Sequence, residues 1–527
     1  MEDGQWVYLN AADQPVTDSW KESKGFWYRL DSAGYITKDT LINVGSSYYY
    51  LDPDGRMAAE AWAYLTADQI PDGDSDSEGW YYFGADGRAY TNKSGARKQI
   101  DGQTYIFDAD GKLLTGWIAS DGTAVEETED PFINATHFAG EDGALYVSKW
   151  LAYSDVMTNV TGSTAHSDVA DRDYTEYDEL WFYFDETGKK VVARTGGTSL
   201  KQKEIDGATY GFDENGVMLP WWSAVDSVAY PDGERADMTS NVSAKYYSGY
   251  DGGVLLKNTW FFMYPSENLS GEDFEDMEAS WWYADGSGKV VRDRIRMING
   301  RRYVFDGIGR MKVGFCLVDG RANYVANYDV DMLSHTDFIE GDIGGIEHAD
   351  LYLFSPDELN DGSMQVGSDI LVSLADGYYY FGFGADGKAY GNKNNNLTYT
   401  PAKKNGKYYY NGLRLDADSE LGYGVVKAER DGQDYYQVVD IDGKIITGEK
   451  KLVADKQGGY FIVLKDRFVA YVNDPYPPKW VKNGVSGEGY YHYDKSNKDD
   501  HYADGIIAGY ADATDLSGLP SEACINF

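Results

Sequence analysis

The chain has 527 residues but only two cysteines, 13 prolines and six histidines. Two cysteines, Cys316 and Cys524, are too few for the disulfide scaffold of a small secreted domain, and the sequence leaves open whether they pair. No stretch approaches the roughly 18 consecutive apolar residues of a membrane-spanning helix. The histidines show no zinc-ligand spacing. These shortages argue against a disulfide-stapled domain, a membrane-spanning helix and a zinc site.

Signatures of catalysis are also missing. We find no nucleophile elbow, no phosphate-binding loop and no Ser/His/Asp context. With 87 acidic residues, accidental carboxylate pairs are unavoidable. A glycoside hydrolase needs two acids at a fixed separation in a cleft, whereas nearly every aspartate that we can place belongs to a turn. We therefore expect no catalytic residues and a protein that is not an enzyme, which a screen on polysaccharides would check.

Positive charge is scarce, because 47 basic residues face 87 acidic ones for a net charge of −40. Such a surface repels nucleic-acid phosphates and disfavours anionic membranes. Neutral glycans and cationic headgroups remain compatible partners. The alternative is that the acidity only keeps an aromatic-rich protein soluble.

What the chain does have is aromatic residues and glycine: 46 Tyr, 20 Phe, 14 Trp and 60 Gly. Short aromatic strands separated by glycine turns indicate an all-β protein. We find no strong amphipathic helix pattern.

A cassette of about a hundred residues recurs. The pattern aromatic-x-aromatic-Asp-x-x-Gly-x-apolar, with some variation, reaches its glycine at Gly87, Gly188, Gly288 and Gly387. The spacings are 188 − 87 = 101, 288 − 188 = 100 and 387 − 288 = 99. Such regularity predicts an array of one supersecondary unit.

The unit is a short β-hairpin. In the first stretch the turn positions Asp13, Gly34 and Gly55 are 21 residues apart. Each is an Asx-type turn in which glycine, or aspartate at 13, takes a positive φ. A tryptophan follows some turn glycines by seven residues, as Trp62 follows Gly55. Because a lone hairpin is marginal in water, we predict an elongated solenoid of stacked aromatic β-hairpins with loop insertions.

Four segments are expected: the most regular hairpins at 1–118, cassettes with long loops at 119–318, degenerate cassettes at 319–480 and a C-terminal capping segment at 481–527. The longest connections are rich in Asp, Ser, Thr and Glu, which is typical of surface loops; they lie at about 119–140, 154–178, 223–244, 264–279 and 319–350.

Two blocks carry a resemblance to a known family. Tyr48–Met57, followed by Trp62, resembles the choline-binding or cell-wall-binding repeat. Asp101–Trp117 resembles the related glucan-binding repeat of glucansucrases and of the repetitive regions of clostridial toxins. The resemblance implies a superhelix of hairpins, shallow aromatic binding sites between consecutive hairpins, secretion and attachment to the bacterial cell surface. No signal peptide precedes Glu2, so we expect Met1 to replace one.

Aromatic rings can stack on sugar faces or cage a quaternary ammonium, at about 0.5–2 kcal/mol per face. The candidate ligand-binding residues are Trp27, Tyr49, Met57, Trp62, Trp80, Tyr81, Tyr105, Trp117, Trp150, Trp181, Tyr210, Met218, Trp221, Trp222, Trp260, Trp281, Trp282, Tyr303 and Met311. The alternative for each is packing of hairpin on hairpin.

We expect no cofactor, with one open alternative. Asp72, Asp74, Asp76 and Glu78 alternate like the start of a calcium loop, but Ser77 stands where such a loop has glycine.

The predicted function is a non-catalytic surface-binding protein for cell-wall polymer or polysaccharide, of glucan or choline type. The alternative is a structural spacer or adhesin whose acidic loops bind a protein partner. A host glycan or protein is a further expected partner, and neither nucleic acid nor membrane insertion is expected.

Overall fold

The computed structural model describes residues 6–92, 96–125, 131–154, 179–194, 200–225, 243–248, 252–264, 278–340, 343, 348–357, 361–391, 402–473, 479–483, 487–493, 501–502 and 514–526. Only the backbone is described for 221, 223–225, 243, 450 and the ranges between 479 and 502. The chain divides into two compact units. Unit 1 is Met1–Ala236 with Asn241–Lys257, and unit 2 is Asp237–Ser240 with Asn258–Phe527.

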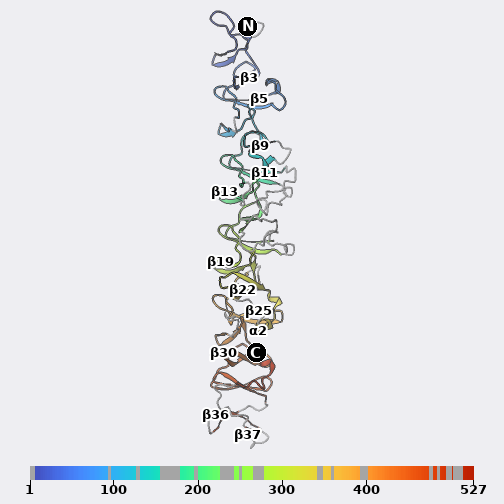
Figure 1. Ribbon diagram of the computed structural model, residues 1–527, viewed down its shortest axis with the longest axis vertical. Coiled ribbons are helices and arrows are strands. Elements are labelled where there is room, and N and C mark those ends of the chain that lie inside the picture. Colours follow the sequence, from blue (N-terminus) through green and yellow to red (C-terminus); the bar gives the residue numbers. More distant parts are fainter. Residues whose placement is uncertain are drawn as a thin grey trace. The chain divides into compact units, whose positions relative to one another are not determined.

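Unit 1 consists of antiparallel two-stranded hairpins that follow one another in chain order (Figure 1). The strands are β1 Trp20–Ser23, β2 Phe26–Arg29, β3 Thr40–Val44, β4 Ser47–Leu51, β5 Ala61–Leu65, β6 Gly79–Phe83, β7 Lys98–Ile100, β8 Gln103–Tyr105, β9 Gly116–Ala119, β10 Ala135–Ala139, β11 Lys149–Tyr153, β12 Leu180–Phe184, β13 Lys201–Ile205, β14 Ala208–Phe212, β15 Trp221–Val225 and β16 Ser243–Tyr247, with 3₁₀ turns η1 Ala67–Gln69 and η2 Pro131–Ile133.

Unit 2 continues with hairpins and adds larger sheets. Its elements are β17 Thr259–Met263, β18 Ser280–Ala284, β19 Arg294–Ile298, β20 Arg301–Phe305, β21 Met311–Lys312, β22 Gly314–Asp319, β23 Tyr324–Tyr328, η5 Val330–Met332, α2 His335–Ile339, β24 Ala349–Phe354, β25 Gly367–Leu374, β26 Gly377–Phe383, β27 Ala402–Lys404, β28 Lys407–Tyr410, β29 Leu413–Arg414, β30 Tyr423–Arg430, β31 Gln433–Asp440, β32 Lys450–Ala454, β33 Tyr460–Leu464, β34 Arg467–Val472, β35 Lys479–Asn483, β36 Gly487–Tyr493, β37 His501–Tyr502 and η6 Ser521–Ala523. The largest sheet has the order β25-β26-β29-β28-β27.

Aspartate and glycine fix the turn of each hairpin. In the turn after β12, the Asp185 Oδ1 accepts hydrogen bonds from the backbone N–H groups of Thr187, at 2.8 Å, and Lys189, at 3.1 Å. Gly188 then takes φ +77°, a region that costs a side-chain-bearing residue strain. Asp13 has φ 56°, as predicted. The Asx-turn prediction is confirmed.

Consecutive turns stack, and this contact explains the glycine as much as its φ does. A Cβ atom on Gly87 would come within 2.4 Å of Met57, the residue two positions beyond the previous turn glycine, Gly55. The same relation joins Gly253 to Met218 and Gly362 to Met311. A backbone hydrogen bond recurs together with this contact between turns. For example, the N–H of Leu113, two residues beyond the turn glycine Gly111, donates to the Trp80 carbonyl at 2.7 Å.

The core is a series of small clusters rather than one centre. Most contain residues from hairpins or turns that are close in the chain, as in the cluster of Leu41, Tyr50, Leu65, Tyr81 and Phe83. The prediction of an all-β chain built from stacked aromatic hairpins is confirmed. Among the described residues, no helix is long and apolar enough to cross a membrane.

Some segments differ from the expected loops. Part of 319–350 forms β23, η5 and the one-turn helix α2, and Phe338 of α2 is buried in the largest core of unit 2. Most of 154–178, 223–244 and 264–279 lies outside the described residues. Cys316 and Cys524 are both free thiols, so they do not pair in this structure. β36 lies within the expected capping segment 481–527, and its capping role stays a prediction.

The four predicted segments also stay a prediction. They follow changes in repeat type, whereas the two compact units follow spatial contacts and divide the chain at Lys257 and Asn258.

Candidate functional site

One arrangement of four rings occurs three times among the residues that the structure describes. A tryptophan on the first strand of a hairpin contacts the tyrosine opposite it, a tyrosine of the next hairpin and a nearby phenylalanine. We call these sets the Trp62 cluster (Trp62, Tyr82, Tyr105, Phe107), the Trp150 cluster (Trp150, Tyr183, Tyr210, Phe212) and the Trp260 cluster (Trp260, Tyr283, Tyr303, Phe305).

The distances in the three clusters match closely. From the tryptophan centroid to the tyrosine of its own hairpin they are 5.0, 5.1 and 5.2 Å in chain order. To the tyrosine of the next hairpin they are 5.1, 4.9 and 4.8 Å, and to the phenylalanine 5.9, 5.8 and 5.7 Å. Both tyrosines are tilted or edge-on to the indole, which is a favourable aromatic geometry. The repeat therefore reproduces one site geometry.

Strand register explains why these rings meet. Trp150 lies directly opposite Tyr183 in the β11–β12 pair, and Trp260 lies opposite Tyr283 in the β17–β18 pair. Directly opposed residues of an antiparallel pair place their side chains on the same face. The equivalent Trp62 and Tyr82 are paired in β5–β6.

A second, partly exposed tryptophan lies beside the central one in two clusters. Trp181 is half-buried, with its centroid 6.4 Å from that of Trp150 and its ring plane at 75°. Trp281 stands in the same relation to Trp260, at 6.5 Å and 85°. Each pair forms two nearly perpendicular aromatic walls. Such walls can hold a sugar face or a quaternary ammonium.

In the Trp62 cluster the equivalent Trp80 is more open. Its side chain is 49% exposed and packs edge-on against Tyr64, at 5.6 Å. The two rings form an exposed aromatic pair on the same hairpin face as Trp62, since strand residues two apart share a face.

Several predicted site residues are buried. Tyr81, Trp117 and Trp282 are at most 1% exposed. The Tyr81 hydroxyl donates to the Ser77 carbonyl, at 2.9 Å, and the Trp282 Nε1 donates to the Met263 carbonyl, at 2.9 Å. These rings have no face open to a ligand, and they pack. Trp222 is also buried, at 7% exposure.

At the N-terminal end, Trp27 is 45% exposed. Tyr49 lies 5.0 Å from Trp20 and accepts a hydrogen bond from the Arg88 Nε at 3.1 Å. The side chain of Trp221 lies outside the described residues.

The methionines Met57, Met218 and Met311 lie beneath turn glycines, and their contact with a ligand stays a prediction. Their flexible thioethers fill the narrow space between stacked turns.

The sequence interpretation missed Tyr82, Tyr183 and Tyr283, and the phenylalanines Phe107, Phe212 and Phe305. A signal for the phenylalanines was present. Each stands two residues after a predicted tyrosine in the recurring string Tyr-x-Phe-Asp.

The fourth cassette replaces the tryptophan with a charge. Asp369 follows Gly362 by seven residues, the spacing at which the earlier cassettes have tryptophan. Its Oδ1 accepts from the Arg414 Nη1 at 2.6 Å and the Lys407 Nζ at 2.9 Å. Burial alone would raise the pKa of Asp369, but hydrogen bonds from these two cations outweigh it and hold the pKa below its usual value. The aromatic site is absent from this described hairpin.

The predicted calcium loop uses its carboxylates internally. The Asp74 Oδ1 accepts from the backbone N–H groups of Asp76 and Ser77, both at 3.1 Å, and a Glu78 oxygen accepts from the Ala67 N–H at 3.0 Å. Within the described ranges, no group of three or more histidine, cysteine or acidic side chains could hold a metal ion. Calcium binding here stays a prediction.

No family model matches the chain. Glucosyltransferase-S of Streptococcus mutans is 24% identical over 322 residues, which is 60% of this chain and 16% of the relative. The chain thus spans about a sixth of the length of the curated relative that it matches.

Among solved structures, choline binding protein F of Streptococcus pneumoniae is 16% identical, with 77% of this chain and 98% of that chain covered and a TM-score of 0.31. The modular autolysin LytC of the same species is 16% identical, covering 65% and 58%, with a TM-score of 0.28. A truncated alternansucrase of Leuconostoc mesenteroides is 22% identical, covering 24% and 10%, with a TM-score of 0.19. These similar proteins are thus a choline binding protein, a modular autolysin and an alternansucrase, in agreement with the resemblance predicted from the repeats.

Proposed function

We propose that the chain is a non-catalytic bacterial surface-binding protein that holds cell-wall polymer or glucan through the Trp62, Trp150 and Trp260 clusters. The observation that carries this proposal is the threefold recurrence of one ring geometry among the described residues. A second, partly exposed tryptophan lies beside the central one in the Trp150 and Trp260 clusters, and the exposed Trp80 lies on the same hairpin as Trp62. Pure packing needs buried rings, but Trp80, Trp181 and Trp281 stay partly open to solvent.

The relatives support the same reading. One of the similar structures is the LytC autolysin in complex with a synthetic peptidoglycan ligand, and another is choline binding protein F. Repeated weak sites on one chain gain by avidity when the ligand is a polymer. A secreted, surface-attached protein follows from such a ligand.

Retention chromatography tests the proposal. Wild-type protein is applied to insoluble glucan, purified Gram-positive cell wall and choline resin, and elution is attempted with soluble oligosaccharide and with choline. The variant Trp80→Leu/Trp181→Leu/Trp281→Leu removes the open walls and keeps the central tryptophans. Trp6→Leu/Tyr378→Leu is the control, because both rings are exposed, at 55% and 74%, outside the clusters.

Retention of the wild type and the control, with loss in the triple variant, supports the proposal, and the eluting ligand identifies the class. Failure of the wild type to bind all three supports contradicts it. The alternative, a spacer or adhesin with a protein partner, rests on acidic loops that lie largely outside the described residues, and it would be favoured if only a protein partner were captured.

A further inference from the structure

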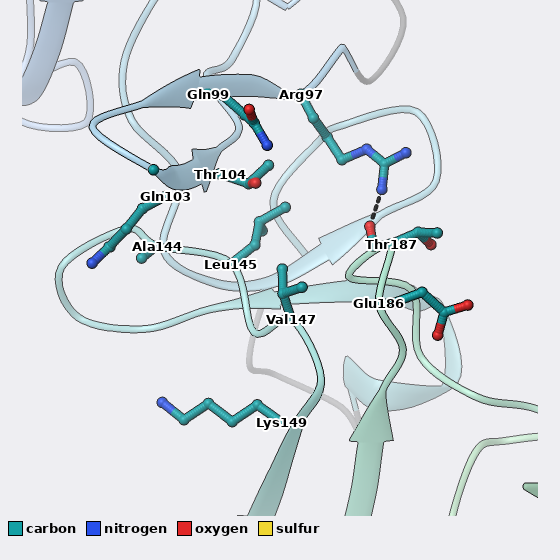
Figure 2. Close-up of a pocket in the computed structure, with 11 residues that line it drawn as sticks. Arg97, Gln99, Gln103, Thr104, Ala144, Leu145, Val147, Lys149, Glu186 and Thr187 are labelled. Atoms are coloured by element: carbon teal, nitrogen blue, oxygen red, sulfur yellow. Dashed lines mark hydrogen bonds between the residues drawn. The ribbon is translucent and has the colours of Figure 1, made fainter. Parts of the chain in front are cut away.

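Unit 1 contains a polar cavity of about 580 Å³ that the aromatic clusters do not explain (Figure 2). It lies between the β7–β8 hairpin, the segment 144–149 and the turn at 186–187. Its volume is within the range of about 300–1,000 Å³ typical of ligand pockets. No aromatic side chain lines it, so it differs in chemistry from the tryptophan clusters.

The cavity has an apolar floor and a polar rim. Leu145 and Val147 lie at its centre in Figure 2. Gln99, Gln103 and Thr104 of the β7–β8 hairpin line one side. Amide and hydroxyl groups both donate and accept hydrogen bonds, and an apolar floor suits the C–H face of a pyranose ring. This combination fits a saccharide better than an apolar ligand.

The charge of the lining favours an anion. Arg97 and Lys149 are both exposed and both line the cavity, on opposite sides of Leu145 and Val147 (Figure 2), and the Lys149 ammonium lies 3.8 Å from the centroid of the Tyr146 ring. The one carboxylate of the lining, on Glu186, is paired with Lys203 at 3.2 Å. Arg97 donates to the Thr187 carbonyl through one of the five donors of its guanidinium. Acidic groups farther than a Debye length of about 8 Å from the cavity are largely screened at physiological salt.

This lining is specific to one place in the repeat. The equivalent positions of the Trp62 and Trp260 cassettes have Ala61 and Thr259 in place of Lys149, and Ala85 and Gly286 in place of Glu186. Arg97 lies one residue before the strand residue that pairs with the tyrosine Tyr105 of the Trp62 cluster. In the neighbouring cassettes, Gln202 and Ile295 stand at this position. Because the general repeat does not require these charges, they indicate a local function.

We propose that this cavity binds an anionic sugar residue, with its ring on Leu145 and Val147, its carboxylate or phosphate held by Arg97, and a hydroxyl group on the other side of the ring held by Lys149. The proposal goes beyond the polymer binding assigned to the tryptophan clusters, and it does not depend on it.

Saturation-transfer NMR on the full chain at physiological ionic strength tests this with three probes, D-glucuronate, D-glucose 6-phosphate and neutral D-glucose, and with inorganic phosphate as an added competitor. Two variants remove one cation each, Arg97→Met and Lys149→Met. Lys149→Met keeps the proposal testable if loss of the Arg97–Thr187 contact disturbs folding. Lys189→Met is the matched control. Lys189 is an exposed cation in the turn that contains Glu186 and Thr187, and it does not line the cavity.

We expect the charged sugars to bind more tightly than glucose, and each cation variant to weaken them roughly threefold or more, while Lys189→Met binds as wild type. Binding of only one charged sugar supports the proposal and identifies the anion as carboxylate or phosphate. Equal binding of glucose, indifference to both variants, or equally tight binding of inorganic phosphate would overturn it. The Trp80/Trp181/Trp281 variant should keep this binding, which separates it from the polymer sites.

Discussion

The Lys190 side chain lies directly beneath the turn glycine Gly216, where a Cβ atom would come within 2.8 Å of its Cδ. Methionines fill the equivalent place beneath Gly87, Gly253 and Gly362. Lys190 is only 7% exposed, and its ammonium donates to the Phe132 carbonyl. A lysine thus occupies a position that the repeat elsewhere fills with an apolar side chain.

We predict that Lys190→Met stabilises unit 1, and most at low pH. Burial lowers the pKa of Lys190 to about 7, although the charge of Asp213 opposes the shift. Because the folded pKa lies below the unfolded value, the charged lysine penalises folding fully below pH 7, and the penalty fades as pH rises toward 10.5. A shift of this size corresponds to an upper limit of about 5 kcal/mol.

Thermal unfolding of both proteins from pH 6 to pH 10 measures this. The variant should be more stable than wild type at pH 6, and the difference in stability between the two proteins should narrow with rising pH. A variant no more stable than wild type at pH 6 would show that the contacts to Phe132 and the nearby Trp117 ring, at 5.8 Å, outweigh the burial.

The stacking of turns predicts that replacing two similar glycines with alanine destabilises the protein to different extents. Gly87 and Gly45 have nearly the same φ, +74° and +72°, but a Cβ on Gly45 meets nothing within 4 Å. Gly45→Ala should cost only the left-handed strain of about 1–2 kcal/mol. Gly87→Ala should cost about 1–3 kcal/mol more, because its methyl group collides with Met57. Denaturant unfolding measures both, and equal losses would refute turn stacking as a stabilising contact.

The turn aspartates predict acid sensitivity. Burial opposes ionisation of Asp185 and Asp285, but hydrogen bonds from Thr187 and Ser287 lead the contributions that lower the pKa of each carboxyl overall. A lowered folded pKa gives stability that is present above the unfolded value of about 3.9 and lost as pH falls through the folded pKa.

The variant Asp185→Asn/Asp285→Asn keeps an Oδ1 acceptor but loses the charge. We expect it to be less stable than wild type at pH 7 and equal to it at about pH 2. Urea unfolding at both pH values checks this. A difference that does not shrink on acidification would mean that the charge of these turns does not matter.

The ion network of the fourth cassette predicts a large penalty for removing one charge. The Arg414 side chain is only 5% exposed, and it bonds both Asp369 and Asp416. Asp369→Ala should destabilise unit 2 by about 1–3 kcal/mol, less than breaking an isolated buried pair, because Asp416 still holds the guanidinium. Lys403→Ala, at an exposed lysine of β27, is the control, and a matching effect there would contradict the network's role.

Sequence periodicity predicted the hairpins, their turn glycines and the central tryptophans, because these follow from local chemistry that repeats. It did not predict which rings are open. Trp281 and Trp282 are neighbours in sequence, and strand alternation sends them to opposite faces, one partly buried and one fully buried. Which face meets the next hairpin depends on stacking, which no local pattern contains.

Contacts between residues far apart in the chain also could not be predicted from the sequence. Trp117 follows Gly116 at the end of the block that resembles the glucan-binding repeat, but Phe132 of η2 and Phe182 cover it, at 6.4 and 5.2 Å. The polar cavity joins Arg97 to Thr187, ninety residues apart. Neither arrangement has a signature within one hairpin.

The most direct test of the tryptophan clusters is a co-sedimentation isotherm with insoluble glucan and with purified cell wall. Wild-type protein and the Trp80→Leu/Trp181→Leu/Trp281→Leu variant are compared, with thermal unfolding of each measured in parallel. We predict that the variant unfolds within a few degrees of wild type yet binds at least tenfold more weakly to the polymer that wild type prefers. Equal binding by a folded variant would contradict the account, because the open aromatic walls would then serve only packing.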